Sequence, residues 1–218
     1  MVDHLSPFFM IETKPLQKLR FIKKSSRLCA VVGLTLATAL AYSQPIDQDK
    51  VNHIKAAYIF HMAQLTTWPS EDLGDLEPLQ VLFIGDGTDK LADILADNTK
   101  TLLVQGRRLE VNQISELSSE FMQPDSLQSA ISDAHIIYVS KNVAANALAA
   151  CRRYANHSIL FAGDGQVVPR NGGMVGFYVD DQRVRINVNL LQVEQATLKM
   201  SAEFLQHVTI VRSTEEGR

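Results

Sequence analysis

The sequence predicts an α/β fold, a three-layer sandwich in which helices cover both faces of a mostly parallel sheet and an antiparallel C-terminal hairpin lies at the edge. Short apolar runs alternate along the chain with segments of helical periodicity, which is typical of right-handed βαβ units. Near the C-terminus, two β-rich runs are separated only by the polar residues Asp180-Asp181-Gln182, the pattern of a β-hairpin. No linker or repeat interrupts residues 47–210, so we expect one domain.

The N-terminal segment has the pattern of a secretory signal peptide. A basic stretch from Lys14 to Arg27 precedes the apolar residues 28–40, and Ala39-Leu40-Ala41 fits the rule of small residues at a cleavage site. The apolar stretch is shorter than the ~20 residues that a spanning helix needs, which disfavours a membrane anchor. We therefore predict a cleaved signal peptide over residues 1–41, with Met1 or Met10 as the start, and one exported domain over 42–218.

Charge and cysteine content restrict the partners of the exported domain. Of the 21 Lys and Arg and the 24 Asp and Glu, residues 42–218 keep 15 and 22, a net charge of −7. No basic patch is left in the sequence, so nucleic acid is not an expected partner. Cys151 is the one cysteine after residue 41, which rules out an internal disulfide. We expect a buried, inert thiol there, with an intermolecular disulfide as the alternative.

The periodicity of the chain predicts the elements of the sandwich. The first helix runs from Asp49 to Thr67, and Trp68-Pro69 ends it because the proline ring disfavours helical backbone at the preceding residue. The continuous apolar run Leu79–Ile84 is the pattern of a strand buried on both faces. The further strands are expected at 109–114, 135–139 and 158–162, and the further helices at 91–95, 127–131 and 142–154.

The C-terminal part is predicted as a hairpin followed by one helix. In the second hairpin run Val184, Ile186 and Val188 alternate with Arg183, Arg185 and Asn187, so one face should be buried and the other wet. Asn189 is expected to cap a helix over residues 190–208 that lies across the sheet and closes the core.

No motif of the sequence predicts catalysis, a metal site or a cofactor. Gly85-Asp86-Gly87-Thr88 resembles a phosphate loop only weakly, since it lacks the third glycine of a dinucleotide fingerprint and the Gly-Lys-Ser/Thr of a P-loop. Gly163-Asp164-Gly165 is interpreted as a turn, and the histidines are scattered. The protein is therefore not expected to be an enzyme.

Three segments resemble a known family. They are Lys55-Ala56-Ala57-Tyr58-Ile59-Phe60 with Trp68-Pro69, the strand from Val81 to Gly85, and Gly172-Gly173-Met174 with 183–190 and 196–201. Over residues 51–208 the chain resembles the YfiR-like family of periplasmic proteins.

The resemblance implies a periplasmic α/β protein, often dimeric, that represses an inner-membrane diguanylate cyclase by binding its periplasmic part. It also implies that an outer-membrane lipoprotein of the peptidoglycan-associated type sequesters the repressor. Characterised repressors of the family carry disulfide cysteines, whereas this domain has only Cys151, so redox control through an internal bridge is not expected.

Two hypotheses about the binding site follow. A protein-binding regulator would use an apolar surface, with Trp68 and Pro69 as its anchor, unless the Trp68 ring instead fills the edge of its own core. A small-ligand binder or sensor, acting on a membrane kinase or transporter, would use the crevice beyond the carboxyl ends of the parallel strands. The residues expected to line that crevice are Gly85, Asp86, Gly87, Thr88, Ser140 and Asn142.

Overall fold

The computed structural model describes residues 46–73, 77–114, 124–155 and 157–212, with only the backbone of 124–127. The predicted signal peptide, residues 1–41, lies outside the described residues and stays a prediction. None of the helices in the described ranges combines the length and the apolar character that crossing a membrane requires.

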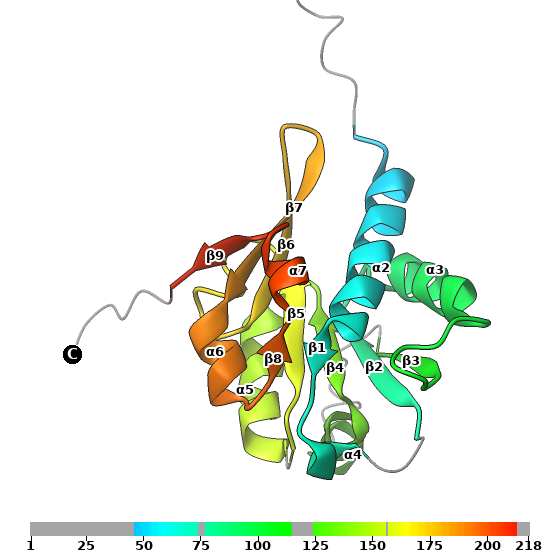
Figure 1. The fold of residues 1–218 in the computed structure, drawn as a ribbon, viewed down its shortest axis with the longest axis vertical. Helices are drawn as coiled ribbons and strands as arrows, with labels where there is room; N and C mark the ends of the chain where they lie inside the picture. The colour runs from blue at the N-terminus through cyan, green and yellow to red at the C-terminus, as the bar shows by residue number, and fades with distance from the viewer. Residues whose placement is uncertain (1–45, 74–76, 115–123, 156, 213–218) are drawn as a thin grey trace, which may run out of the picture. The chain divides into compact units, whose positions relative to one another are not determined.

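A seven-stranded sheet forms the middle layer, in the order β3-β2-β4-β5-β6-β7-β9 (Figure 1). The first five of these strands are parallel, β7 is antiparallel to β6, and β9 is parallel to β7. This confirms the mostly parallel sheet. The strands are β2 (Leu79–Ile84), β3 (Leu109–Ile114), β4 (Ile136–Val139), β5 (Leu160–Asp164), β6 (Val175–Asp180), β7 (Arg183–Asn189) and β9 (Thr209–Val211).

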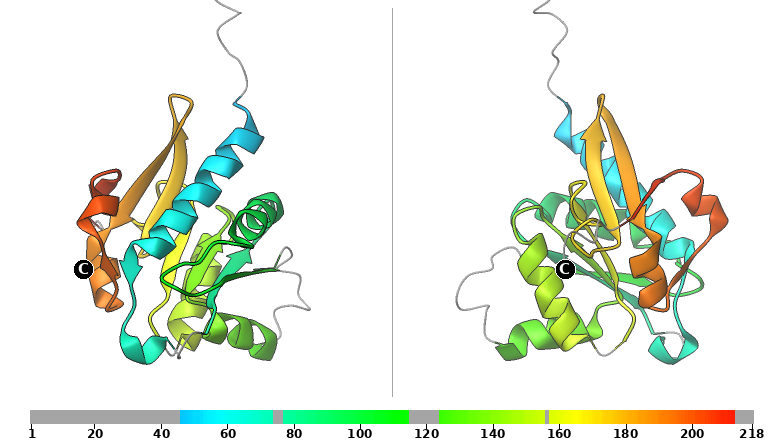
Figure 2. Two further views of the ribbon diagram at one scale, coloured as in Figure 1. Left: turned by 45° about the vertical axis from the view of Figure 1, so that its right-hand side comes forward. Right: turned by 90° about the vertical axis from the view of Figure 1, so that its left-hand side faces the viewer.

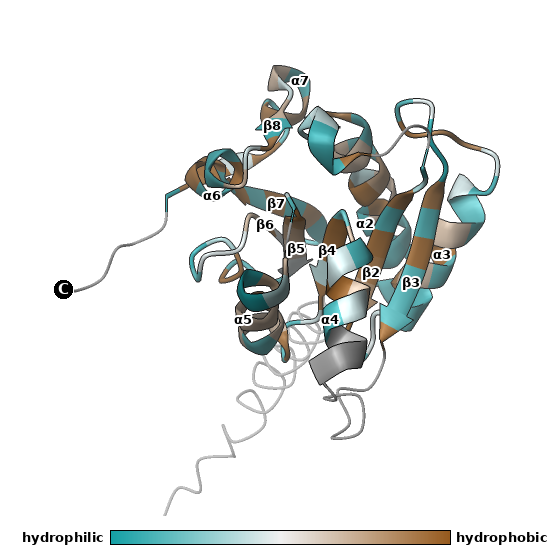
Figure 3. Cartoon of the chain, turned by 90° about the horizontal axis from the view of Figure 1, so that it is seen from below, coloured by the Kyte–Doolittle hydropathy of each residue, from teal (hydrophilic) through white to brown (hydrophobic). Residues whose placement is uncertain are grey.

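Helices cover both faces of the sheet, as predicted (Figure 2). On one face lie α2 (Gln48–Gln64) and α3 (Asp89–Thr99), and on the other lie α4 (Pro124–Asp133) and α5 (Ala144–Tyr154). Alternate residues of β2 enter different hydrophobic clusters: Val81 and Phe83 pack with the first pair of helices, Leu82 and Ile84 with the second. Figure 3 shows the hydrophobic residues of β2 and β4 between the two helical layers.

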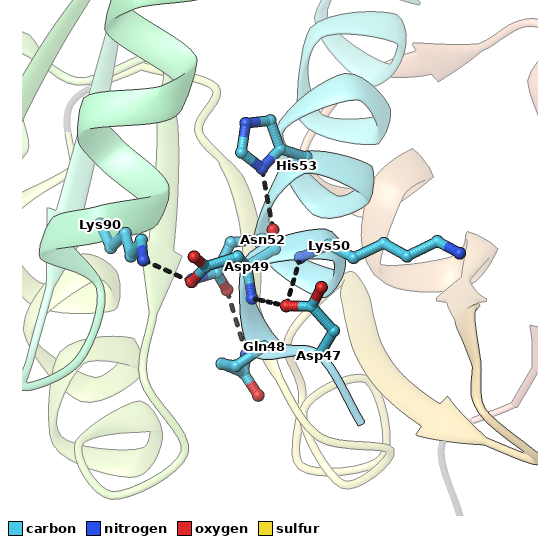
Figure 4. Close-up of polar contacts among 7 residues, drawn as sticks. All are labelled: Asp47, Gln48, Asp49, Lys50, Asn52, His53 and Lys90. Carbon is cyan, nitrogen blue, oxygen red and sulfur yellow. Dashed lines mark hydrogen bonds and ion pairs between the residues drawn. The ribbon is translucent and has the colours of Figure 1, made fainter. Parts of the chain in front are cut away.

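The start of α2 is fixed by its sequence. The Asp47 carboxylate accepts hydrogen bonds from the backbone N–H groups of Asp49 and Lys50, at 3.0 and 3.3 Å, and so caps the helix. Asp49 also forms an exposed ion pair with Lys90 of α3 (Figure 4). These contacts fix where α2 begins and join it to α3 on the same face of the sheet.

The predicted single helix over 190–208 is wrong. The segment instead forms α6 (Leu190–Gln195), β8 (Lys199–Met200) and α7 (Ala202–Leu205), and then leads into β9. Helical backbone ends where Thr197 adopts a φ of 57° and Ser201 caps a new helix. β8 pairs antiparallel with β1 (Thr66–Thr67), a long-range contact that periodicity does not reveal. The expected cap at Asn189 is confirmed, since its side chain accepts from the Gln192 N–H.

The hairpin of β6 and β7 is confirmed, with two corrections. The short strand β9 lies outside β7, so β7 is not the terminal strand of the sheet. Asn187, predicted on the wet face, is buried like its neighbour Asn189, because the loop that follows β5 covers both side chains. Their side-chain amides donate to the loop carbonyls of Gln166 and Pro169, at 3.0 and 2.8 Å.

Candidate functional site

A partly buried polar cluster lies at the carboxyl edge of the parallel strands. The Lys55 ammonium of α2 donates to Asp164 Oδ1 at 2.5 Å, and the Tyr138 hydroxyl of β4 donates to the same oxygen at 2.6 Å. The Lys55 side chain is 10 % exposed and the Asp164 side chain 32 %. Burial raises the pKa of the Tyr138 hydroxyl well above its ordinary value, and the charge of Asp164 and its hydrogen bond add to the rise. The cluster ties the middle of α2 to the end of β5.

The local sequence brings Asp164 to this position. Asp164 is the last residue of β5, and the preceding residue, Gly163, has no space for a side chain. A Cβ at Gly163 would lie 2.7 Å from the Val139 carbonyl oxygen. Gly165 then turns the chain with a φ of 106°. Sequence reasoning interpreted this segment only as a turn and missed the ion pair, whose partners are 109 positions apart. The one signal of this ion pair in the sequence was Lys55 itself, a lysine within the apolar stripe of a predicted helix.

The residues predicted to line a ligand crevice lie at the same edge. Gly85, Asp86, Gly87 and Thr88 follow β2, while Ser140 and Asn142 follow β4, and these two strands are neighbours in the sheet. The strand order reverses between them, which is where α/β sheets bind ligands. The structure therefore brings the two predicted segments together.

Side chains fill the space between these two segments. A Cβ at Gly85 would lie 2.3 Å from Ser140 Oγ and 2.6 Å from Val143 Cγ2. The Thr88 hydroxyl donates to the Gly85 carbonyl at 2.7 Å, which closes the turn. The buried Ser140 hydroxyl has no hydrogen-bond partner among the described residues. Ligand binding by these six residues stays a prediction.

The Trp68-Pro69 corner lies at the end of the β1 segment. The Trp68 ring is 4 % exposed and belongs to the cluster that packs under α2, while Pro69 is half-buried. This is the second of the two roles that the sequence left open for Trp68. A contact of Trp68 with a partner stays a prediction, and in this conformation the ring would support such a contact from beneath.

A polar cleft of about 810 Å³ lies at the opposite, amino edge of the strands. Among its lining residues are Glu71, Asp72, Asp133 and the paired rings of His135 and His157, whose centroids are 5.5 Å apart. Burial, and then the charge of His157, lower the pKa of His135. The described ranges contain no group of three His, Cys, Asp or Glu residues that could hold a metal ion. The sequence did not predict this cleft.

The comparison with protein families decides which family this is. The profile of the YfiR/HmsC-like family matches residues 52–207, almost the whole described domain. The chain belongs to the YfiR/HmsC-like family. The suspected resemblance is thereby confirmed, and the YfiR/HmsC-like match includes Lys55, Trp68, Tyr138 and Asp164.

Two solved structures are similar to parts of this YfiR/HmsC-like chain. A conserved domain protein from Vibrio cholerae O1 biovar El Tor str. N16961 has a TM-score of 0.45 and 10 % identity, and the match covers 60 % of this chain and 54 % of that one. The ABC domain in complex with L-Trp from Streptococcus pneumoniae has a TM-score of 0.46 and 8 % identity, covering 61 % and 56 %. The chain thus spans a little over half the length of these proteins. A comparison with curated proteins gives no significant match.

Proposed function

We propose that the protein is a periplasmic regulator that represses an inner-membrane diguanylate cyclase by binding the periplasmic part of that enzyme. The observation that carries the proposal is the YfiR/HmsC-like match over residues 52–207. In this proposal the repressor acts without catalysis, and an outer-membrane lipoprotein of the peptidoglycan-associated type is its sequestering partner.

The contacts of three residues from the segments that resemble the family support a function that depends on the surface. Lys55 lies in the partly buried ion pair with Asp164, Trp68 lies in the core, and Gly173 packs against Val168 and Phe161. These residues stabilise the fold, which supports a role for the segments as a scaffold. A repressor needs only to bind one state of its target more tightly than the other.

The Trp68-Pro69 corner is the proposed contact site on this scaffold. Pro69 is half-buried, and Ser70 and Glu71, which follow in the short 3-10 turn Ser70–Asp72, are exposed. Tryptophan and its neighbours often form the centre of protein interfaces, surrounded by a polar rim. In this arrangement Trp68 would set the position of the turn and the exposed residues would meet the cyclase.

Deletion of the gene tests the proposed function. Cyclic di-GMP should rise in the deletion strain and return to the original level when the wild-type gene is restored. Unchanged cyclic di-GMP after deletion would overturn the repressor assignment and favour the alternative, a sensor that acts on a membrane kinase or transporter.

Charge reversal tests the contact site separately. Glu71→Lys should weaken repression at unchanged protein level, because Glu71 is exposed beside Pro69. Glu194→Lys is the matched control, since Glu194 is an exposed glutamate on α6. Equal repression by both variants would remove the Trp68-Pro69 corner from the proposed interface and leave the repressor function standing.

A further inference from the structure

A second cavity, of about 230 Å³, lies between α5 and α6 and has mainly apolar walls. Its lining residues include Leu148 and Cys151 of α5, Phe161 of β5 and Met174. An engineered apolar cavity of ~150 Å³ is large enough to bind benzene. The cavity between α5 and α6 is therefore large enough for a small molecule with one aromatic ring and one small polar group.

The Gly172-Gly173-Met174 segment, which marks the family resemblance, shapes this cavity. Gly172 has a φ of 92°, and a Cβ there would lie 2.2 Å from Nη2 of Arg152. The missing side chain thus leaves room for the Arg152 guanidinium at the rim. Gly173 lets the backbone approach Phe161, since a Cβ at Gly173 would lie 3.1 Å from its ring. Met174 then lines the wall, where its thioether can contact an aromatic ring.

The charge at the rim favours an anion. Arg152 is exposed in the last turn of α5, and its guanidinium forms no ion pair with a carboxylate of the described residues. The other polar residues of the lining include Gln192 and Gln195, whose amides are hydrogen-bonded to each other at 2.9 Å. No Asp or Glu lies among the lining residues of this cavity. A guanidinium beside an apolar cavity is the arrangement that recognises a carboxylate on an apolar body.

We propose that this cavity binds a small aromatic carboxylate, with the ring against Phe161 and Met174 and the carboxylate on Arg152. The same arrangement distinguishes such a ligand from its neutral analogue, because only the carboxylate gains a charge-assisted hydrogen bond from the guanidinium. This proposal does not depend on the repressor function.

Calorimetric titration of the purified protein with benzoate tests the site. Wild-type protein should bind benzoate, and the neutral benzamide should bind at least about tenfold more weakly, a difference of ~1.4 kcal/mol. Arg152→Gln should weaken benzoate binding by a similar factor of about ten, while Arg152→Lys should keep part of it. Arg153→Gln is the matched control, since Arg153 is exposed at the next position of α5 and does not line the cavity.

A variant that fills the cavity tests the location. Ala196 lines the cavity, so Ala196→Leu should abolish binding of both probes while circular dichroism shows a folded protein. The proposal is overturned if benzoate gives no binding to the wild type at millimolar concentration. It is overturned equally if Arg152→Gln and Arg153→Gln bind benzoate alike, or if Ala196→Leu binds it as the wild type does.

Discussion

One substitution at Trp68 distinguishes its two possible roles, filling the core and anchoring a partner. Its ring is buried, so Trp68→Ala should lower the free energy of unfolding by ~3–5 kcal/mol, the cost of a large cavity. Urea unfolding measures this. Trp68→Phe should lower it less, since it keeps most of the ring volume and removes the buried Nε1–H that has no partner among the described residues. A loss below ~0.5 kcal/mol for Trp68→Ala, the range of surface substitutions, would contradict the core role.

Lys55 permits a similar test of the partly buried polar cluster. Lys55→Met should lower the free energy of unfolding by ~2–3 kcal/mol, because it leaves the carboxylate of Asp164 beside Tyr138 without its cation. The loss should stay below that of a fully enclosed pair, since the Asp164 side chain is one-third exposed. Lys50→Met, on an exposed position of α2, is the control and should change little. Equal unfolding curves for the two variants would show that the cluster does not stabilise the fold.

Single residues also show what sequence reasoning can and cannot reach. The burial of Cys151 was predictable from its alanine-rich helical surroundings, and burial raises the pKa of its thiol to about 12. The partner of Asp164 was not predictable, because an ion pair across 109 positions depends on how α2 lies over the sheet. The burial of Asn187 was not predictable either. Its polar side chain suggested exposure, but its amide donates a hydrogen bond to a loop carbonyl.

At the scale of one element, the turn of the hairpin makes a testable prediction. Asp181 and Gln182 have φ values of 46° and 58°, and a two-residue turn with both central φ positive favours glycine at its second position. Gln182→Gly should therefore raise the free energy of unfolding by roughly 0.5–1 kcal/mol. Gln113→Gly, at an exposed position of β3, is the matched control and should lower it. A loss of stability on Gln182→Gly, seen in chemical denaturation, would count against this turn geometry.

Elements differ in how far local patterns determine them. The start of the first helix was predicted to within one residue, and its Asp47 cap explains why. Its predicted end at Thr67 is wrong, because the helix ends at Gln64 and Thr66 and Thr67 form β1. The 190–208 segment has a similar apolar content, yet its helical backbone ends before Thr197. The residues that follow form β8, which pairs with Thr66 and Thr67. That pairing is a tertiary interaction, and it overrides the local helical preference.

At the scale of the whole molecule, the layers were predictable, and the packing at the carboxyl edge of the strands was predictable only in part. Alternating strands and helices imply a parallel sheet with two covered faces, and the structure has both. The carboxyl edge was the expected location of a ligand crevice, but its segments pack against each other through Ser140 and Val143. The two cavities described above lie where elements distant in sequence meet: one beside His135 and His157, the other between α5 and α6. Composition and periodicity do not predict which elements distant in sequence contact each other.

The amino edge of the sheet predicts how the stability of the whole molecule depends on pH. His135 joins neighbouring strands: its N–H donates to the Gln80 carbonyl at 2.9 Å, its carbonyl accepts from Leu160 N at 2.9 Å, and its ring Nδ1 accepts from the Gln80 N–H at 3.2 Å. An imidazole that accepts through Nδ1 loses this hydrogen bond when Nδ1 takes up a proton. Protonation of His135 at Nδ1 therefore destabilises the hydrogen bonding between His135 and Gln80 at the start of β2.

The sign of the pH effect follows from the lowered pKa of His135. Burial is its main cause, followed by the charge of His157, with Arg107 acting in the same direction and Asp72 against it. The unfolded chain takes up a proton near the ordinary histidine pKa of about 6.5, whereas the folded protein resists it to a lower pH. The contribution of His135 to stability is thus fully present above about pH 6.5 and is lost as the pH falls below it. Urea unfolding at about pH 7.5, about pH 6.5 and about pH 5.5 should show the free energy of unfolding falling toward acid. His135→Gln should reduce this fall, and His207→Gln, at an exposed position, should leave it in place. If the His135→Gln protein loses stability toward acid as steeply as the wild type, groups other than His135 cause the dependence.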